Sequence, residues 1–172
     1  ITFYIMNIIL IGMMGAGKSL VGNRLAGKIS KDFYDLDHWI EKRHNSKIPK
    51  IFENNGEEYF RKIEAECFSE IIATDNEKVI STGGGAPLNS GCKNHFLGNE
   101  VIFLDAYPDI LFQRASKRKD DRPLLKNLNY KEFEQLYNER RKIYSSISNL
   151  TLDTSNTDIR ETVKKIMEYY EF

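Results

Sequence analysis

The sequence predicts an α/β fold in which helices cover both faces of a parallel β-sheet. Short runs rich in Ile, Val, Leu and aromatic residues alternate with longer stretches that permit helices, and this alternation is typical of parallel sheets. The first run, at residues 8–11, is followed by the glycine-rich segment GMMGAGKS at residues 12–19. That segment fits the G-x-x-x-x-G-K-[ST] pattern, which joins a strand to a helix around bound phosphate. The 172 residues are expected to form one domain, residues 1–172.

The elements follow one another in strand–helix order. Strands are expected where the runs are short and apolar or β-branched, at residues 7–11, 32–35, 78–82, 101–105 and 150–153. Helices are expected between and after them, at residues 18–29, 37–43, 48–54, 56–73, 89–96, 108–117, 130–146 and 158–170. The helix at 56–73 has two glutamates in its first turn, where the helix dipole favours negative charge.

The glycine-rich segment predicts a site for a nucleoside triphosphate. Its backbone N–H groups can surround phosphate oxygens, and the following helix adds its positive N-terminal end. Lys18 is expected to reach the β- and γ-phosphates, and the Ser19 hydroxyl is expected to ligate Mg²⁺. The alternative is a strand-to-helix turn without a ligand, which requires neither of these residues. The expected nucleotide-binding residues of the segment are Gly15, Ala16, Gly17, Lys18, Ser19 and Leu20.

Composition excludes several classes of partner. Lysine and arginine together number 25, as do aspartate and glutamate, so the net charge is zero. A neutral chain argues against a broad electrostatic partner such as nucleic acid or an anionic membrane. The apolar start, residues 1–11, is too short to span a bilayer and lacks the features of a signal peptide. Two widely spaced cysteines, Cys67 and Cys92, favour a reducing, cytoplasmic setting over a disulfide framework.

Two carboxylates follow the second strand in the segment Asp35-Leu36-Asp37. Ligand groups of open α/β sheets gather at the carboxyl ends of strands. One carboxylate could hold Mg²⁺ and the other could accept a hydrogen bond from a substrate hydroxyl. A helix cap followed by an acidic first turn is an equal alternative on the spacing alone.

Arg61 and Glu64 stand three residues apart, so they can pair on one face of the helix at 56–73. An exposed pair on an amphipathic helix explains this spacing equally well, and the local sequence favours it. Arg61 nevertheless follows Phe60 at the edge of the apolar face. From that position its guanidinium could point into a cleft and be oriented by Glu64.

Three glycines in a row, Gly83, Gly84 and Gly85, follow the third strand. They let the backbone approach a ligand closely, and the position at a strand end favours this function over a flexible turn. This strand lacks the acidic residue that usually ends its counterpart in phosphate-binding folds. Asp35 could supply that carboxylate near Mg²⁺.

Basic residues gather between the fourth strand and the helix at 130–146. Residues 117–129 are highly charged without a clear period and are expected to form a mobile lid, within a wider lid region of 112–129. Arg122 could place a cation on a transferring phosphoryl group. Two adjacent arginines, Arg140 and Arg141, point in different directions, so we expect at most one to face the cleft.

In this order, these segments resemble the shikimate kinase family over nearly the whole chain. The matching strings are GMMGAGKS, DLD, FRKIE at residues 60–64, STGGGA, RPLL and ERRKIY at residues 139–144. The first is shared by many unrelated proteins, whereas the combination is far more specific. The resemblance implies a three-layer phosphate-binding-loop fold, with a five-stranded parallel sheet of order 2-3-1-4-5. It also implies transfer of the γ-phosphoryl group of ATP to the 3-hydroxyl of shikimate, in aromatic amino-acid biosynthesis.

The resemblance also implies roles for individual residues. Ser19 and Asp35 would serve Mg²⁺, and Asp37 would hold the shikimate hydroxyls and act as the base. Residues 32–62 would form the substrate-binding region, in a cytoplasmic monomer. The remaining implied residues are Arg61 and Arg140 for the carboxylate, Gly83, Gly84 and Gly85 along the substrate, Arg122 as the lid cation, and Arg114 or Arg118 near adenine.

Two positions depart from the family pattern: Leu20 replaces a threonine, and Ile159 stands where a proline is usual. Three alternatives remain open. A gluconate-type kinase would not need two arginines beside the paired carboxylates. A non-catalytic kinase-like protein would be expected to lack Lys18, Asp37 or Arg122. A nucleotide-switch GTPase would carry an Asn-Lys-x-Asp string, which this sequence does not contain.

Overall fold

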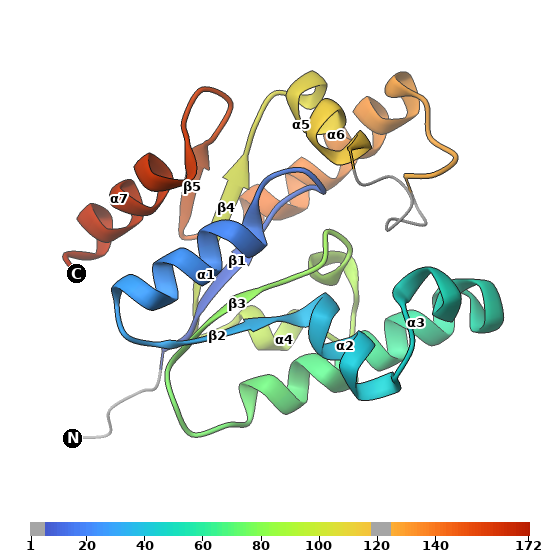
Figure 1. Ribbon diagram of the computed structural model, residues 1–172, viewed down its shortest axis with the longest axis horizontal. Coiled ribbons are helices and arrows are strands. Elements are labelled where there is room, and N and C mark those ends of the chain that lie inside the picture. The colour runs from blue at the N-terminus through green and yellow to red at the C-terminus, as the bar shows by residue number, and fades with distance from the viewer. Residues whose placement is uncertain (1–5, 118–124) are drawn as a thin grey trace.

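The computed structural model describes residues 6–117 and 125–172 of the chain. Its centre is a five-stranded sheet in which all neighbouring strands are parallel, in the order β2-β3-β1-β4-β5 (Figure 1). The strands are β1 (Ile8–Ile11), β2 (Asp32–Asp35), β3 (Lys78–Ser81), β4 (Glu100–Asp105) and β5 (Leu150–Asp153). The predicted fold class and strand order are therefore confirmed.

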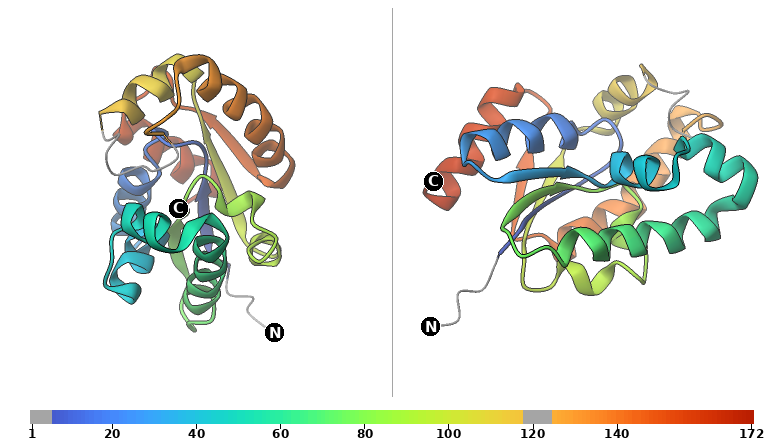
Figure 2. Two further views of the ribbon diagram at one scale, coloured as in Figure 1. Left: turned by 90° about the vertical axis from the view of Figure 1, so that its right-hand side faces the viewer. Right: turned by 60° about the horizontal axis from the view of Figure 1, so that its bottom comes forward.

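Helices cover both faces of this sheet. Helices α1 and α7 pack against each other on one face, and α4 and α6 lie on the other (Figure 2). The helices are α1 (Lys18–Lys28), α2 (Leu36–His44), α3 (Ile48–Ile72), α4 (Lys93–Phe96), α5 (Pro108–Ser116), α6 (Tyr130–Ile147) and α7 (Ile159–Tyr170), with a short 3₁₀ turn, η1 (Ala86–Leu88). No helix within residues 6–117 and 125–172 is both long and apolar enough to cross a membrane.

The apolar runs become the central strands because helices cover them on both faces. All residues of β1 and β3 are buried, and so is β4 after its first residue. The edge strands β2 and β5 are partly exposed, and both carry polar residues. Such continuous burial is typical of the interior of a parallel sheet.

Side-chain caps fix where several helices begin. The Asn129 side chain accepts a hydrogen bond from the Glu132 N–H, and the Glu132 carboxylate accepts one from the Asn129 N–H, which together form a capping box for α6. Asp158 caps α7 by accepting a hydrogen bond from the Glu161 N–H. Helix α6 is thus held at a defined start, which matters because it carries Arg140 and Arg141.

Three expected helices differ from the structure. The helix expected at residues 89–96 is wrong in its first half, where a turn follows η1 and precedes the short α4. Glycine and asparagine at positions 89–91 favour turns, and Asn89 Oδ1 accepts a hydrogen bond from the Gly91 N–H. The helices expected at 48–54 and 56–73 run together as α3, with a non-helical backbone at Gly56 (φ 80°, ψ 176°). The predicted interruption is present, as a sharp bend.

The parallel arrangement brings the carboxyl ends of all five strands to one edge of the sheet. The glycine-rich loop follows β1, Asp35 ends β2, and Gly83, Gly84 and Gly85 follow β3. Asp105 ends β4, and Thr154 follows β5. Polar residues from segments distant in sequence therefore lie at one edge.

Candidate active site

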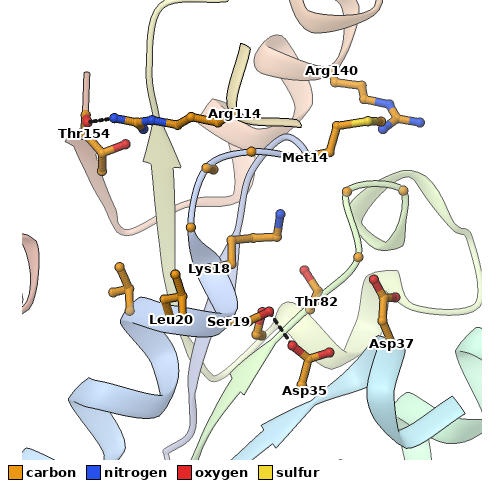
Figure 3. Close-up of a pocket in the computed structure, with 18 of the residues that line it drawn as sticks. Met14, Lys18, Ser19, Leu20, Asp35, Asp37, Thr82, Arg114, Arg140 and Thr154 are labelled. Carbon is orange, nitrogen blue, oxygen red and sulfur yellow. Dashed lines mark hydrogen bonds between the residues drawn. The ribbon is translucent and has the colours of Figure 1, made fainter. Parts of the chain in front are cut away.

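A cavity of about 600 Å³ opens at this edge. The glycine-rich loop lies in the middle of the site (Figure 3). Arg114 and Thr154 lie on one side of the loop, and Asp37 and Arg140 lie on the other (Figure 3). The cavity therefore has two ends, each with its own polar groups, joined across the loop.

Glycine is required in the loop because backbone atoms of other segments approach it closely. A Cβ at Gly12 would lie 2.5 Å from the carbonyl oxygen of Leu104, and one at Gly15 would lie 2.4 Å from that of Leu111. Gly15 also has a φ of +89°, which disfavours any other residue. The loop is thus pressed against β4 and α5 while its other side faces the cavity.

Lys18 opens α1 and lines the cavity. Its Nζ donates hydrogen bonds to the carbonyl oxygens of Gly12 (2.8 Å) and Met13 (2.9 Å). These bonds hold the ammonium group over the loop, where the N–H groups of the first helical turn add positive potential. The arrangement suits the phosphates of a nucleotide.

Ser19 and Asp35 meet below the loop. The Ser19 hydroxyl donates a hydrogen bond to Asp35 Oδ2, and Oδ1 of the same carboxylate accepts one from the His38 N–H (3.1 Å). Asp35 is thus the N-cap of α2, as the capping alternative predicted, and it also lines the cavity.

The Ser19–Asp35 pair fits a magnesium ion better than a metal held by protein alone. Among the described residues, no group of three or more His, Cys, Asp or Glu side chains could hold a metal ion. Mg²⁺ is usually bound by one or two protein oxygens together with waters and phosphate oxygens. A hydroxyl and a carboxylate beside a phosphate-binding loop match that requirement.

Asp37 lies at the opposite end of the cavity from Arg114. Burial is the main cause that raises its pKa to about 7, and the carboxylates of Asp35 and Glu64 raise it further, against the opposing charge of Lys18. A carboxyl group with this pKa exchanges a proton near neutral pH. The Asp37 carboxyl group can therefore both hold and release a proton near neutral pH.

Each of the three glycines after β3 lies close to a charged side chain of the cavity. A Cβ at Gly83 would lie 2.9 Å from Asp37 Oδ1, and one at Gly84 would lie 3.2 Å from Arg140 Nη1. A Cβ at Gly85 would lie 2.4 Å from both terminal nitrogens of Arg61. The glycines thus allow one carboxylate and two guanidinium groups to meet at a single backbone segment.

Arg61 is held by two carboxylates on its own helix. Its Nη1 donates to Glu64 Oε2 (2.9 Å), and its Nη2 donates to Glu57 Oε1 (3.1 Å). Glu64 is only 1% exposed and also accepts a hydrogen bond from Asn89 Nδ2 (3.0 Å). The exposed pair favoured by the local sequence is therefore wrong for Glu64, whereas Arg61 is half-buried and Glu57 is exposed. Burial alone would lower the pKa of Arg61, but Glu64 and Glu57 outweigh it and raise the pKa.

The two adjacent arginines of α6 have different surroundings. Arg140 is 6% exposed and lines the cavity, and no described residue offers a hydrogen-bond partner to its buried Nε. Arg141 Nε instead donates to Asp105 Oδ2 at 2.8 Å. One turn beyond Arg140, the Tyr144 hydroxyl donates to the carbonyl oxygen of Gly84 at 2.5 Å. Arg140 is thus the member of the doublet that faces the cleft.

Comparison with known proteins identifies the family. Residues 14–171 match the family model described as shikimate kinase. The chain belongs to the shikimate kinase family. It is 40% identical to the shikimate kinase of Bacillus subtilis (strain 168) over 163 residues, which cover 94% of this chain and 87% of that protein.

Solved structures agree with this assignment. The shikimate kinase from Acinetobacter baumannii in complex with shikimate superimposes with a TM-score of 0.90 at 31% identity, covering 98% of this chain and 94% of that chain. The shikimate kinase from Aquifex aeolicus gives a TM-score of 0.83 at 38% identity, with 96% of each chain covered. The chain is therefore an ATP-using kinase of the shikimate kinase family, which decides against a GTPase or a non-catalytic protein.

The end of the cavity near Arg114 is formed by the loop between β5 and α7. Arg114 Nη2 donates to the carbonyl oxygen of Thr154 (3.1 Å), and Thr157 and Ile159 line the same end. Leu20, which is 62% exposed, also lines the cavity. The resemblance to shikimate kinases also implied Arg118 near adenine and Arg122 as the lid cation, and both residues lie outside the described part of the chain.

Apolar side chains that no sequence motif indicated form a wall of the cavity. Ile48, Phe52 and Phe60 line the cavity, and the rings of Phe52 and Phe60 lie 4.6 Å apart between centroids. Residues of this type in a helical stretch usually belong to the core. The glycine at position 56 was the available signal, because a bend between two aromatic residues can turn both toward one space.

Proposed function

We propose that this chain transfers the γ-phosphoryl group of ATP to the 3-hydroxyl of shikimate, with ATP and Mg²⁺ in the end of the cavity near Arg114 and shikimate in the end near Asp37. The observation that carries the proposal is the convergence of Asp37, Arg61 and Arg140 on the three glycines. Shikimate carries one carboxylate and several hydroxyls, so it needs cationic groups and a hydrogen-bond acceptor in one small space. Membership of the shikimate kinase family supports the same substrate.

Arg61 and Arg140 would hold the shikimate carboxylate. A guanidinium group offers two parallel N–H donors to a carboxylate, which an ammonium group cannot match. The buried Nε of Arg140 lacks a partner among the described residues, so a bound carboxylate would satisfy a donor that is otherwise unpaired. Gly83, Gly84 and Gly85 would line the ring of the substrate.

Asp37 would hold the reacting hydroxyl and accept its proton. With a pKa of about 7, a large part of the carboxyl groups is ionised at neutral pH and can receive that proton. Phosphoryl transfer otherwise requires positioning and neutralisation of charge, because the transferred group carries its own reactivity.

Lys18 and the loop residues Gly15, Ala16, Gly17, Ser19 and Leu20 would bind the nucleotide. Ser19 and Asp35 would hold Mg²⁺, which would neutralise phosphate charge and help orient the nucleotide. Arg114 would contact the base of the nucleotide.

We also propose that Arg122 supplies a lid cation to the phosphates. The enzyme would act as a cytoplasmic monomer, without nucleic-acid partners. The zero net charge and the two unpaired, buried cysteines are compatible with this setting.

The proposed function is tested by a coupled assay of ADP release. Shikimate is compared with gluconate, with other sugar acids and polyols, and with a shikimate analogue that lacks the carboxylate. Activity is expected with shikimate and is expected to be at least ~100-fold weaker in kcat/KM without the carboxylate, because two guanidinium groups lose their partner. Lys18→Met should fold and lose at least ~100-fold in kcat. Equal activity with gluconate, or equal activity without the carboxylate, would rule out the proposed substrate.

A further inference from the structure

The carboxylate of Asp105 connects the end of β4 to α6. Asp105 is 7% exposed, and its Oδ1 accepts hydrogen bonds from the Tyr137 hydroxyl (3.1 Å) and from the Ala106 N–H (3.0 Å). Its Oδ2 accepts one from Arg141 Nε at 2.8 Å. Tyr137 and Arg141 lie four residues apart on α6 and therefore occupy the same face of that helix. The buried carboxylate thus accepts hydrogen bonds from two successive turns of α6.

A second face of the same helix points into the cavity. Arg140 approaches the backbone of Gly84, and Tyr144 donates to the carbonyl oxygen of that glycine. Residues 140 and 144 are also four apart, so they form a stripe beside that of Tyr137 and Arg141. Neighbouring residues of a helix are turned by about 100° from each other. The hydrogen bond between Arg141 and Asp105 therefore also fixes the direction in which Arg140 points.

The arginine doublet makes this restraint important. A rotation of α6 by one residue would exchange Arg140 for Arg141, and either arginine could then reach the cleft. We propose that Asp105 is a positioning residue for the phosphoryl-transfer reaction: by binding Arg141 and Tyr137, it keeps Arg141 out of the cleft and fixes Arg140 against the glycine segment. This inference rests on the proposed role of Arg140 as a ligand of the substrate carboxylate.

The contacts of Asp105 also predict whether truncation of its side chain weakens the binding of shikimate or of ATP. Its side chain bonds to α6, whereas its main-chain carbonyl oxygen accepts hydrogen bonds from the Thr154 N–H (2.8 Å) and Oγ1 (3.0 Å). Thr154 in turn holds Arg114 at the nucleotide end. Truncation of the side chain leaves the carbonyl in place. It should therefore loosen the shikimate end and spare the nucleotide end.

The test compares Asp105→Ala and Arg141→Ala with the full-length wild-type enzyme. Asp105→Ala is expected to raise the KM for shikimate about 10-fold, since a small misplacement of a binding group can reduce rates by up to about 100-fold. The kcat and the KM for ATP should stay within about twofold of wild type. The contact of Arg140 with the substrate carboxylate is made equally before and during phosphoryl transfer, so its loss affects binding of shikimate alone. Arg141→Ala should change the same constant in the same direction but less. Since the side chain of Arg141 is 52% exposed, this variant keeps the test available if Asp105→Ala does not fold.

Two further variants complete the comparison. Lys164→Ala removes an exposed ion pair with Glu168 on α7 and should leave all three constants unchanged. In the double variant Asp105→Ala/Arg141→Ala, the KM for shikimate should rise by less than the product of the two single effects, because both act through one contact. A fully multiplicative effect would overturn the proposed contact between them.

Arg140→Ala separates this inference from the proposed function. If Arg140→Ala leaves the KM for shikimate unchanged, the proposed carboxylate clamp is wrong and the role of Asp105 falls with it. If Arg140→Ala raises that KM while Asp105→Ala and Arg141→Ala leave it within about twofold, only the positioning role is overturned. An equal rise in the KM for ATP would also overturn it, because that result indicates general loosening.

Discussion

At the scale of single residues, Asp37 determines how the protein should respond to pH. Burial and the neighbouring carboxylates, chiefly Asp35 and Glu64, raise its pKa to about 7. If Asp37 is the base, kcat/KM for shikimate should increase with pH up to about 7 and then level off, because only the ionised form accepts a proton. A rate profile from pH 5 to 9 measures this. Asp37→Asn should abolish transfer at every pH while leaving ATP binding nearly intact, and full activity in that variant would contradict the assignment.

The same residue predicts an effect on stability. The pKa of Asp37 in the folded protein exceeds that of an unfolded aspartate, about 3.9, so between these values the folded state binds more protons. The contribution of Asp37 to the free energy of unfolding should therefore fall as pH rises from about 4 to 7. Asp37→Asn should be more stable than wild type at pH 8 by about 1 kcal/mol or more, with a smaller difference at pH 4. Thermal unfolding at both pH values tests this, and a less stable variant at pH 8 would contradict it.

Gly85 predicts a loss of substrate binding without a loss of folding. A Cβ at this position meets the end of the Arg61 side chain, which is able to move, and the backbone of Gly85 is unstrained (φ −89°). Gly85→Ala should therefore raise the KM for shikimate about 10-fold and change Tm by less than about 3 °C. Gly15→Ala is the contrasting variant, because its Cβ meets the backbone of α5 at a positive φ and should lower Tm clearly. Similar behaviour of the two variants would contradict this distinction.

At the scale of elements, the bend in α3 lies between Phe52 and Phe60, which line the cavity. Gly56 has a positive φ, and a Cβ there would contact nothing within 4 Å, so Gly56→Ala tests the backbone alone. This substitution should destabilise the protein by about 1–3 kcal/mol and raise the KM for shikimate, because Phe52 and Phe60 lie on opposite sides of the bend. Gly27→Ala, at an exposed position in α1, should be neutral or stabilising by up to about 1 kcal/mol. Thermal unfolding and kinetics of both variants provide the comparison.

The sequence predicted elements best where a single local pattern dominated. All five predicted strands are present, and the pattern was clearest for the central strands β1, β3 and β4, because buried parallel strands are continuous in hydrophobicity. The helix expected at 89–96 was wrong in its first half, because local hydrogen bonding at Asn89 competed with helix formation. The burial of Glu64 could not be predicted, since it depends on Asn89 and on the glycine segment, which are distant in sequence.

At the scale of the whole molecule, both ends of the cavity should add to stability when occupied. A ligand that binds only the folded state at about 100 times its Kd adds about 2.7 kcal/mol, which corresponds to a rise in Tm of roughly 5–10 °C. We expect a non-hydrolysable ATP analogue with Mg²⁺ to give such a rise. Removal of Mg²⁺ with EDTA should reduce it, because the metal ion that Ser19 and Asp35 are proposed to hold is then absent. An equal rise with and without Mg²⁺ would contradict the magnesium site, and Lys18→Met provides a control with weakened nucleotide binding.

The candidate site was predictable to the extent that topology alone assembles it. Asp35, Asp37 and the three glycines follow strand ends, and parallel strands bring their ends together. Local sequence geometry could not decide which of Arg140 and Arg141 faces the cavity, because it does not specify how α6 is rotated about its axis. Asp105 and Tyr137 determine that rotation, and neither stands in a recognisable motif.

The central position of β1 also bears on how the chain folds during synthesis. Ile8 pairs with Val79 on one side and with Glu100 on the other, so no neighbour of β1 is local. Gly12 packs against the backbone of Leu104, which is made later still. The loop that would hold phosphate therefore takes its shape only after more than half of the chain has left the ribosome. Synthesis proceeds at about 5–20 residues per second, so the apolar edges of β1 remain unpaired for several seconds. Such long-range pairing folds slowly, and the nascent chain is most exposed to aggregation in that interval.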